Sequence, residues 1–196
     1  MSETIEIEFK NMLTKSEYEK LLDTFKITET QIFSQENHYF DTPDFALKHK
    51  ESALRIRVKE NIYEMTLKQP HQIGLLETTQ ILNEEEFSAA IKNGILPRGI
   101  IYDRLTSMAV SFTDVEYFGS LVTKRVEIPY KNGLLVFDHS LYLNKEDYEL
   151  EYEAQDYHLG QQIFLELLNQ HTIPQRTTEN KIRRFYRHKK KITSNY

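Results

Sequence analysis

The chain has 196 residues, of which 39% are hydrophobic and 12% aromatic, and we expect residues 1–196 to form a single domain around one sizeable core. It contains no cysteine, which excludes disulfides, thiolate catalysis and cysteine-bound metals and favours a cytoplasmic protein. The net charge of −5 argues against nonspecific nucleic-acid binding, which needs surplus lysine and arginine, and the sequence has no apolar run long enough to predict a membrane span.

Alternating apolar and polar residues predict about eight strands along the chain. The predicted strands cover residues 4–10, 37–41, 53–59, 63–69, 75–82, 122–130, 134–138 and 148–154. Turn-forming residues join several of them as antiparallel neighbours, namely KENI at 59–62, KNG at 131–133 and NKED at 144–147. The sequence therefore predicts an antiparallel meander.

The sequence predicts five helices, three of which are amphipathic segments that begin at a recognisable capping residue. The first begins at Thr14, whose spacing to Glu17 is that of a capping box, and the second begins at Asn83, which stands in the same relation to Glu86. Asp156 is expected to cap a third helix. The other two are expected at residues 100–108 and 181–190.

The polar faces of the predicted strands carry charges of both signs instead of the usual mixture of Thr, Ser, Gln and Lys. In EIEFK, residues 6–10, the side chains of Glu6, Glu8 and Lys10 alternate with apolar ones and therefore share one face of the strand. The same alternation recurs in four other strands, at Arg55 and Arg57, at Glu64, Thr66 and Lys68, at Arg125 and Glu127, and at Glu149, Glu151 and Glu153.

Two interpretations fit this pattern. In the first, the strands form a half-buried sheet whose charged face lies in water, and the mixed signs form cross-strand ion pairs. In the second, the amphipathic helices cover the apolar face of a curled sheet, so that the charged face becomes the inside of a closed barrel. The matched Arg and Glu positions on several strands favour the second interpretation.

A charged barrel interior has to be wet, mutually paired or filled by a charged ligand. About a dozen ionised groups, each costing several kcal/mol to desolvate, would exceed a net stability of about 5–15 kcal/mol. A barrel of about eight strands is wide enough for one small ligand. Because Arg and Lys suit phosphate oxygens and clustered carboxylates suit Mg²⁺ or Mn²⁺, the residues indicate a metal-chelated polyphosphate.

Several sequence motifs follow one another along nearly the whole chain. They are EIEFK, YFDTPDFALKHKESALRIRV, EMTLKQP, LLET, TKRVEIPY, LLVFDH, YELEYEA and ENKIRRF. In this order they resemble the CYTH superfamily, the triphosphate tunnel metalloenzymes, which include thiamine triphosphatases, inorganic triphosphatases, class IV adenylate cyclases and fungal-type RNA triphosphatases. The resemblance implies an α+β, mainly antiparallel fold: an eight-stranded closed β-barrel with a charged lumen for the triphosphate and helices packed outside.

The resemblance also implies roles for the charged residues. Metal, as Mg²⁺ or Mn²⁺, would be bound by Glu6, Glu8, Glu151 and Glu153, with Glu149 as a neighbour and Glu77, Glu127 and Asp138 as further carboxylates. Phosphate oxygens would be bound by Lys10, Arg55, Arg57, Lys68, Arg125, Lys181 and Arg183. The catalytic set would be Glu6, Glu8, Lys10, Arg57, Glu151 and Glu153. The family's usual Ser before the late Lys is Asn180 in this chain.

The expected reaction is metal-assisted attack of water on a terminal phosphoryl group of a small-molecule triphosphate. Inorganic triphosphate is favoured over nucleotide or thiamine triphosphate, because the chain shows no extra domain for an organic tail. Two alternatives stay open, a noncatalytic polyphosphate or nucleotide sensor and a cyclase acting on ATP. We expect no membrane partner, and a homodimer is left open.

Two other features have simpler interpretations. The seven His residues show no metal-like spacing and are expected to be structural or surface residues. The basic end RRFYRHKKK is interpreted as a solvated helix end, and the alternative is a contact for an acidic partner or for a substrate tail.

Overall fold

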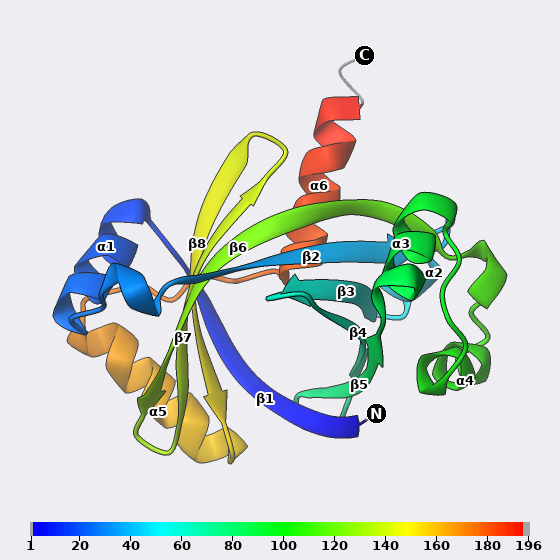
Figure 1. Ribbon diagram of the computed structural model, residues 1–196. Coiled ribbons are helices and arrows are strands. Elements are labelled where there is room, and N and C mark those ends of the chain that lie inside the picture. The colour runs from blue at the N-terminus through cyan, green and yellow to red at the C-terminus, as the bar shows by residue number, and fades with distance from the viewer. Residues whose placement is uncertain (1, 194–196) are drawn as a thin grey trace. The chain divides into compact units, whose positions relative to one another are not determined.

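The computed structural model describes residues 2–193, in which eight strands pair in the order β1-β5-β4-β3-β2-β6-β7-β8 and close into an antiparallel barrel (Figure 1). This confirms the predicted number of strands and the predicted fold class. The strands are β1 (Ser2–Leu13), β2 (Phe33–Asp41), β3 (Ala53–Lys59), β4 (Ile62–Pro70), β5 (Leu75–Leu82), β6 (Glu116–Tyr130), β7 (Gly133–Tyr142) and β8 (Lys145–Ala154).

The predicted helices form where their capping residues lie. Thr14 and Asn83 each begin a helix with a complete capping box, and the Asp156 carboxylate accepts a hydrogen bond of 2.8 Å from the backbone of Leu159. The helices are α1 (Lys15–Thr24), α2 (Ala46–His49), α3 (Glu84–Asn93), α4 (Ile100–Ser107), α5 (Tyr157–Gln170) and α6 (Lys181–Thr193). Two short 3₁₀ segments, Glu29–Gln31 and Phe112–Asp114, complete the order.

The short helix α2 was not predicted, because a single helical turn is too short to show apolar periodicity. Its start is fixed by the carboxylate of Asp41, which accepts hydrogen bonds from the backbone of Leu47 at 2.9 Å and of Lys48 at 3.2 Å. Burial raises the pKa of Asp41, and these backbone donors counteract that rise.

The predicted turns are confirmed, with one correction of position. Glu60 and Asn61, with φ of 49° and 65°, form the two-residue link between β3 and β4. The KNG segment joins β6 to β7, as expected. The turn predicted at NKED, residues 144–147, lies earlier in the chain, at Leu143 and Asn144. Strand β8 therefore begins at Lys145, three residues before the predicted strand.

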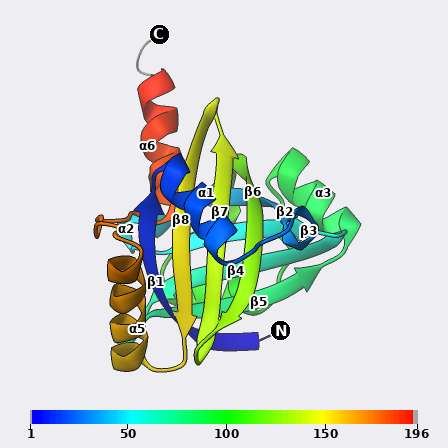
Figure 2. The same cartoon turned by 90° about the vertical axis from the view of Figure 1, so that its left-hand side faces the viewer.

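The described chain divides into two compact units, one made of residues 2–6 and 35–120 and the other of residues 7–34 and 121–193. In the first unit, α3 and α4 pack on β3 and β4 through a core that includes Leu54, Met65, Ala90 and Leu105. In the second unit, α1 and α5 pack on β7 and β8 through a core that includes Leu21, Phe137, Leu150 and Leu167, and α1 lies across the sheet (Figure 2).

In each unit the helices α1, α3, α4 and α5 cover the apolar face of the strands, and charged side chains occupy the opposite face. On β3, Leu54 and Ile56 are fully buried in the core, whereas Arg55 between them lies on the other face. On β8, Leu150 and Tyr152 belong to the core, and Glu151 between them does not. The predicted division of the strands into an apolar face and a charged face is therefore confirmed in each unit.

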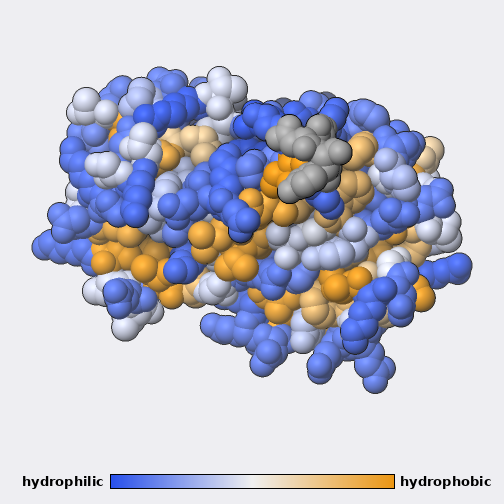
Figure 3. Space-filling model, turned by 90° about the horizontal axis from the view of Figure 1, so that it is seen from above, coloured by the Kyte–Doolittle hydropathy of each residue, from blue (hydrophilic) through white to orange (hydrophobic). Residues whose placement is uncertain are grey.

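Hydrophilic side chains predominate on the face of the molecule shown in Figure 3. Across residues 2–193, no helix has both the length and the apolar character needed to cross a membrane.

Candidate functional site

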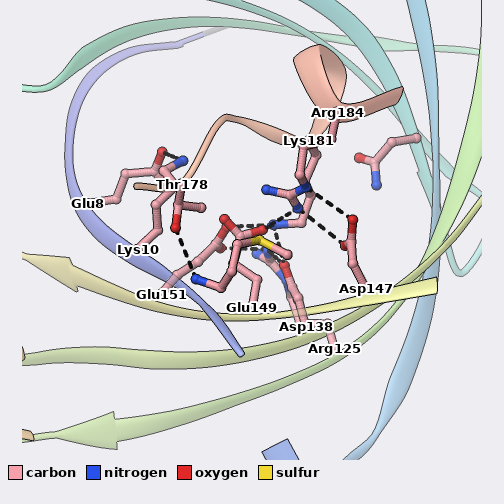
Figure 4. Close-up of polar contacts among 12 residues, drawn as sticks. Glu8, Lys10, Arg125, Asp138, Asp147, Glu149, Glu151, Thr178, Lys181 and Arg184 are labelled. Carbon is pink, nitrogen blue, oxygen red and sulfur yellow. Dashed lines mark hydrogen bonds and ion pairs between the residues drawn. The ribbon is translucent and has the colours of Figure 1, made fainter. Parts of the chain in front are cut away.

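Charged side chains gather in the second unit, on the face of its strands opposite the apolar core (Figure 4). We name this group the buried cluster; it consists of Arg125, Asp138, Asp147, Glu149, Glu151, Lys181 and Arg184. Strands β6, β7 and β8 contribute five of these residues, and α6 contributes Lys181 and Arg184. Cations and carboxylates alternate in space, so that each carboxylate contacts at least one cation.

Strand register explains why these side chains meet. Arg125 on β6 lies opposite Asp138 on β7, and Asp138 lies opposite Glu149 on β8. Residues directly opposite each other in an antiparallel pair point to the same face and have neighbouring side chains. Glu151 lies two residues further along β8, on the same face, and opposite Lys10 of β1.

Arg125 of β6 connects carboxylates from β7 and β8. Its Nε and Nη2 donate to the two carboxylate oxygens of Asp138 at 2.7 and 2.6 Å, and Nη2 also donates to Glu151 at 2.9 Å. Burial alone would lower the pKa of Arg125, but the Asp138 and Glu151 carboxylates outweigh it and raise this pKa. Burial alone would raise the pKa of Asp138, which Arg125 and Lys181 lower instead.

Lys181, at the start of α6, brings three carboxylates together. Its ammonium lies 2.8 Å from Asp138, 2.7 Å from Glu149 and 2.6 Å from Glu151. Burial alone would lower the pKa of Lys181, but these three carboxylates raise it well above its ordinary value. The pKa of Glu151 moves the other way: burial alone would raise it, and Lys181 and Arg125 hold it well below its ordinary value.

Arg184 is a member of the site that the sequence prediction missed, since Arg183 was chosen instead. Its guanidinium donates to Glu149 at 2.7 Å and to Asp147 at 3.1 Å, and the hydroxyl of Tyr142 donates to the same Asp147 carboxylate at 2.7 Å. Helical geometry could have shown this, because residues three apart share a face of a helix and Arg184 follows Lys181 at that spacing.

The start of α6 accounts for Asn180, at the position where the resemblance to the CYTH superfamily implies a Ser. The side-chain oxygen of Asn180 accepts a hydrogen bond of 3.0 Å from the backbone of Arg183. Asn and Ser are comparable N-cap residues, so this substitution preserves the helix start that positions Lys181.

Lys10 and Glu8 of β1 lie beside the buried cluster and form an ion pair with each other. Burial alone would lower the pKa of Lys10, and the carboxylates of Glu8, Glu151 and Glu149 outweigh it and raise this pKa. Glu153 lies opposite Glu8 in the strand register and lines an open pocket with Lys131 and Gly133.

The first unit contains a smaller group of charges, which we name the half-buried cluster; it consists of Glu6, Arg55, Lys68 and Glu77. The ammonium of Lys68 lies 2.6 Å from Glu6 and also pairs with Glu77, which is opposite it in the strand register. Burial alone would raise the pKa of Glu77, but Lys68 and Arg55 lower it.

The two arginines of β3 differ in their contacts. The Nε of Arg57 donates to the side chain of Asn37 at 3.1 Å, its opposite residue on β2. The Nε of Arg55 is buried and makes no hydrogen bond within residues 2–193. A buried donor without a partner is costly, and an incoming anion would satisfy it.

Other predicted site residues lie at the margin of these clusters. Glu127 is about one-third exposed, and its carboxylate lies 3.6 Å from Arg125, beyond ordinary hydrogen-bonding distance. The side chain of Arg183 is half-buried on α6.

The residues fit a divalent cation in chemistry, although they are not arranged around one. Within the part of the chain that the structure describes, no three His, Asp or Glu side chains are spaced as metal ligands. The carboxylates of the buried cluster contact cationic side chains instead. One carboxylate oxygen, Oε1 of Glu149, is nevertheless buried without a hydrogen-bond partner among the described residues. Oxygen donors of this kind are those that Mg²⁺ and Mn²⁺ prefer.

His139, which follows Asp138 in the sequence, has structural contacts, and the basic end is partly paired. His139 stacks on Tyr148 with ring centroids 4.5 Å apart and contacts Glu146 at 2.8 Å. On α6, exposed Arg187 pairs with Glu179 at 2.7 Å.

Comparison with known proteins places these features in a family. The CYTH domain profile matches residues 4–186. The Bacillus subtilis (strain 168) protein named "Putative triphosphatase YjbK" is 51% identical over 191 residues, which cover 97% of this chain and 99% of that protein.

Two solved structures are similar over nearly their whole length. A "putative adenylate cyclase" from Bacillus halodurans is 43% identical, with a TM-score of 0.92, and the match covers 95% of this chain and 100% of that one. The "Putative adenylyl cyclase HpAC1" from Hippeastrum, described as having a dominant triphosphatase activity, is 21% identical, with a TM-score of 0.79 over 94% of this chain and 96% of that one. At this identity the second likeness shows the fold alone.

Proposed function

Because the chain belongs to the CYTH domain family, we propose that it is a metal-dependent phosphohydrolase that cleaves a small triphosphate, with inorganic triphosphate as the favoured substrate. The observation that carries this proposal is the buried cluster, in which cations and carboxylates from three strands and α6 interlock on the inner face of the barrel. The name of the Bacillus subtilis relative supports the same reaction. The absence of cysteine favours a cytoplasmic location for it.

The basic groups are proposed to bind phosphate oxygens. In the first unit, Arg55 offers its unpaired Nε, and Lys68 and Arg57 lie on the same face of the sheet. In the second unit, Lys10, Arg125 and Lys181 are held in their charged forms by the carboxylates around them. Fixed positive charges that neutralise the charge developing on phosphoryl oxygens lower the barrier to phosphoryl transfer.

The carboxylates are proposed to bind the divalent cation that the family implies. Glu6 and Glu77 would do so in the first unit, and Glu8, Asp138, Glu149, Glu151 and Glu153 in the second, with Glu127 at the margin. A Mg²⁺ or Mn²⁺ held by them would supply charge neutralisation and would lower the pKa of a water molecule. No Ser, Cys or His nucleophile is required.

Release of phosphate from inorganic triphosphate, ATP and thiamine triphosphate, measured with Mg²⁺ or Mn²⁺ and again with a chelator, tests the proposal. We expect release only with metal.

The Glu151→Gln variant should lose at least about a hundredfold in turnover, because one charged group of the site is removed. The matched control Glu166→Gln, at an exposed residue on α5, should keep the wild-type rate. Absence of release from every substrate would exclude the hydrolase.

Cyclisation of ATP is the second candidate, because the Bacillus halodurans relative is described as a cyclase. Production of cyclic AMP and pyrophosphate instead of orthophosphate would identify it. Tight triphosphate binding without either product would identify a sensor.

A further inference from the structure

The outer turns of α6 carry cations that the proposed reaction does not use. The helix holds seven Lys and Arg residues and no acidic residue, although the whole chain has a net charge of −5. We propose that the exposed cations of α6 bind a linear inorganic polyphosphate longer than triphosphate, whose end lies against the phosphate-binding groups of the second unit. This inference rests on the proposed function and extends its substrate in length.

Three exposed cations share one face of α6. Arg187 is followed three and four residues later by Lys190 and Lys191, which is the spacing of neighbours on a helix surface. We name these three residues the α6 stripe. The side chain of Arg187 is 57% exposed and pairs with Glu179 at 2.7 Å. An exposed ion pair contributes little to stability, so a phosphate group can replace Glu179 at small cost.

The α6 stripe continues from the proposed site. Lys181, in the first turn of the same helix, contacts Asp138, Glu149 and Glu151 in the buried cluster. Figures 1 and 2 show α6 leading outward from there toward the end of the chain. Lys191 lies ten residues after Lys181, or roughly 15 Å further along the helix. A ligand that reaches both places has to be longer than triphosphate.

The other side chains of α6 favour a phosphate chain over other partners. Ile182, Phe185 and Tyr186 are 6%, 1% and 7% exposed, so the described helix lacks the open apolar face with which a helix binds a membrane. Single-stranded nucleic acid is bound largely through bases that stack on exposed aromatic rings, and both aromatic residues of α6 are buried. Apart from Ile192 at its end, α6 presents mainly charge to solvent, which is what a chain of phosphate groups requires.

Calorimetry without metal tests the proposal, with long-chain polyphosphate and triphosphate as separate ligands. The stripe variant is Arg187→Gln with Lys190→Gln and Lys191→Gln. The matched control removes three exposed lysines of the same unit, in Lys15→Gln with Lys20→Gln and Lys26→Gln. We expect the stripe variant to bind the long chain at least about tenfold more weakly than the control does, with a shallower dependence on salt, because phosphate contacts are lost. Triphosphate affinity should be equal in the two variants, and triphosphate should displace the long chain.

Equal affinity of the stripe variant and the control for the long chain would overturn the proposal. Long-chain binding that triphosphate does not displace would also overturn it, because the chain would then lie outside the proposed site. Equally tight binding of polyglutamate or of single-stranded RNA would show a surface for polyanions in general and would overturn it too. None of these measurements requires hydrolysis. A protein that binds the long chain as expected but releases no phosphate would refute the proposed function and leave this inference standing.

Discussion

The two charged clusters arise from the same sequence pattern but differ in burial and in how fully they are paired. In the buried cluster, the side chains of Asp138 and Glu149 are fully buried and that of Lys181 is 12% exposed. In the half-buried cluster, the side chain of Lys68 is 19% exposed and that of Glu6 is 20% exposed. The first group is held together by interlocking ion pairs, whereas the second is more open to solvent.

This difference separates two physical roles. Removing one partner of a buried ion pair strongly destabilises a protein, because the other charge stays buried and unpaired. The ion pairs of the buried cluster therefore hold α6 in place on β7 and β8. The half-buried cluster keeps an unsatisfied donor, the Nε of Arg55, and its ion pairs cost less to rearrange when an anion arrives. The comparison therefore predicts that substitutions in the buried cluster lower stability as well as activity, whereas substitutions in the half-buried cluster weaken binding with a smaller loss of stability.

The largest expected effect is on stability in the buried cluster. Replacing Arg125 with Met removes one of the two cations that Asp138 and Glu151 share and should lower the free energy of unfolding by about 3–5 kcal/mol. Lys68→Met, the matched change in the half-buried cluster, should cost clearly less. Urea unfolding of both variants measures the difference, and equal losses would show that the two clusters are energetically alike.

The next effect is on triphosphate binding in the half-buried cluster. Arg55→Ala removes a charged donor and should weaken binding by about 1.5–3 kcal/mol, or roughly 10- to 150-fold, with little change in stability. Calorimetry with a nonhydrolysable triphosphate measures this loss. Arg98→Ala, at an exposed arginine packed on Tyr102 in the same unit, is the control. A loss as small as that of the control would place Arg55 outside the binding site.

A smaller effect is expected on the pH dependence of stability, to which one histidine in each unit contributes. Burial lowers the pKa of His38, although the Glu36 carboxylate opposes this, and Tyr117 contacts the ring at 3.3 Å. The unfolded chain therefore takes up a proton at a higher pH than the folded one, and stability should fall as pH drops below about 6.5, by at most about 1.4 kcal/mol per pH unit.

The control for this pH effect is the second unit. Burial also lowers the pKa of His171, which is half-buried, so its contribution should be smaller. His38→Gln should flatten the dependence of stability on pH more than His171→Gln does, as measured by unfolding between pH 5 and about 7.5. The opposite order would show that burial does not set the difference.

The smallest effect is expected to be equal in the two units. Thr14→Ala and Asn83→Ala each remove a capping-box residue at an exposed helix start, one in each unit, and should each cost about 1 kcal/mol. Thermal unfolding compares them. A markedly larger loss for one variant would mean that its unit depends on that helix start for more than local stability.

Local signals predicted much of the fold. Alternation assigned Leu54 and Arg55 to opposite faces of β3, and the spacing of Thr14 and Glu17 placed the start of α1. Strand ends were predicted less well: β6 begins at Glu116, six residues before the predicted start, because the residues before Val122 do not alternate. Pairing with a neighbouring strand extends a strand beyond its own pattern.

The sequence predicted which strands carry the charged residues of the site, but not which cation pairs with which carboxylate. The register of β6, β7 and β8 brings Arg125, Asp138 and Glu151 together, and all three had been named as site residues. Which cation would contact which carboxylate depends on how α6 docks, and no local pattern encodes this. Arg184 was missed for that reason, although its helical spacing from Lys181 was a usable signal.

The claim that the charged face of the strands binds triphosphate is tested most directly by a crystal structure with Mn²⁺ and a nonhydrolysable triphosphate. We predict that oxygens of the analogue lie within hydrogen-bonding distance of Arg55 and Lys68, on the face of β3 and β4 opposite α3 and α4. An analogue bound only to the helix-covered side or to the basic end of α6, with the face that carries Arg55 left without it, would contradict the account.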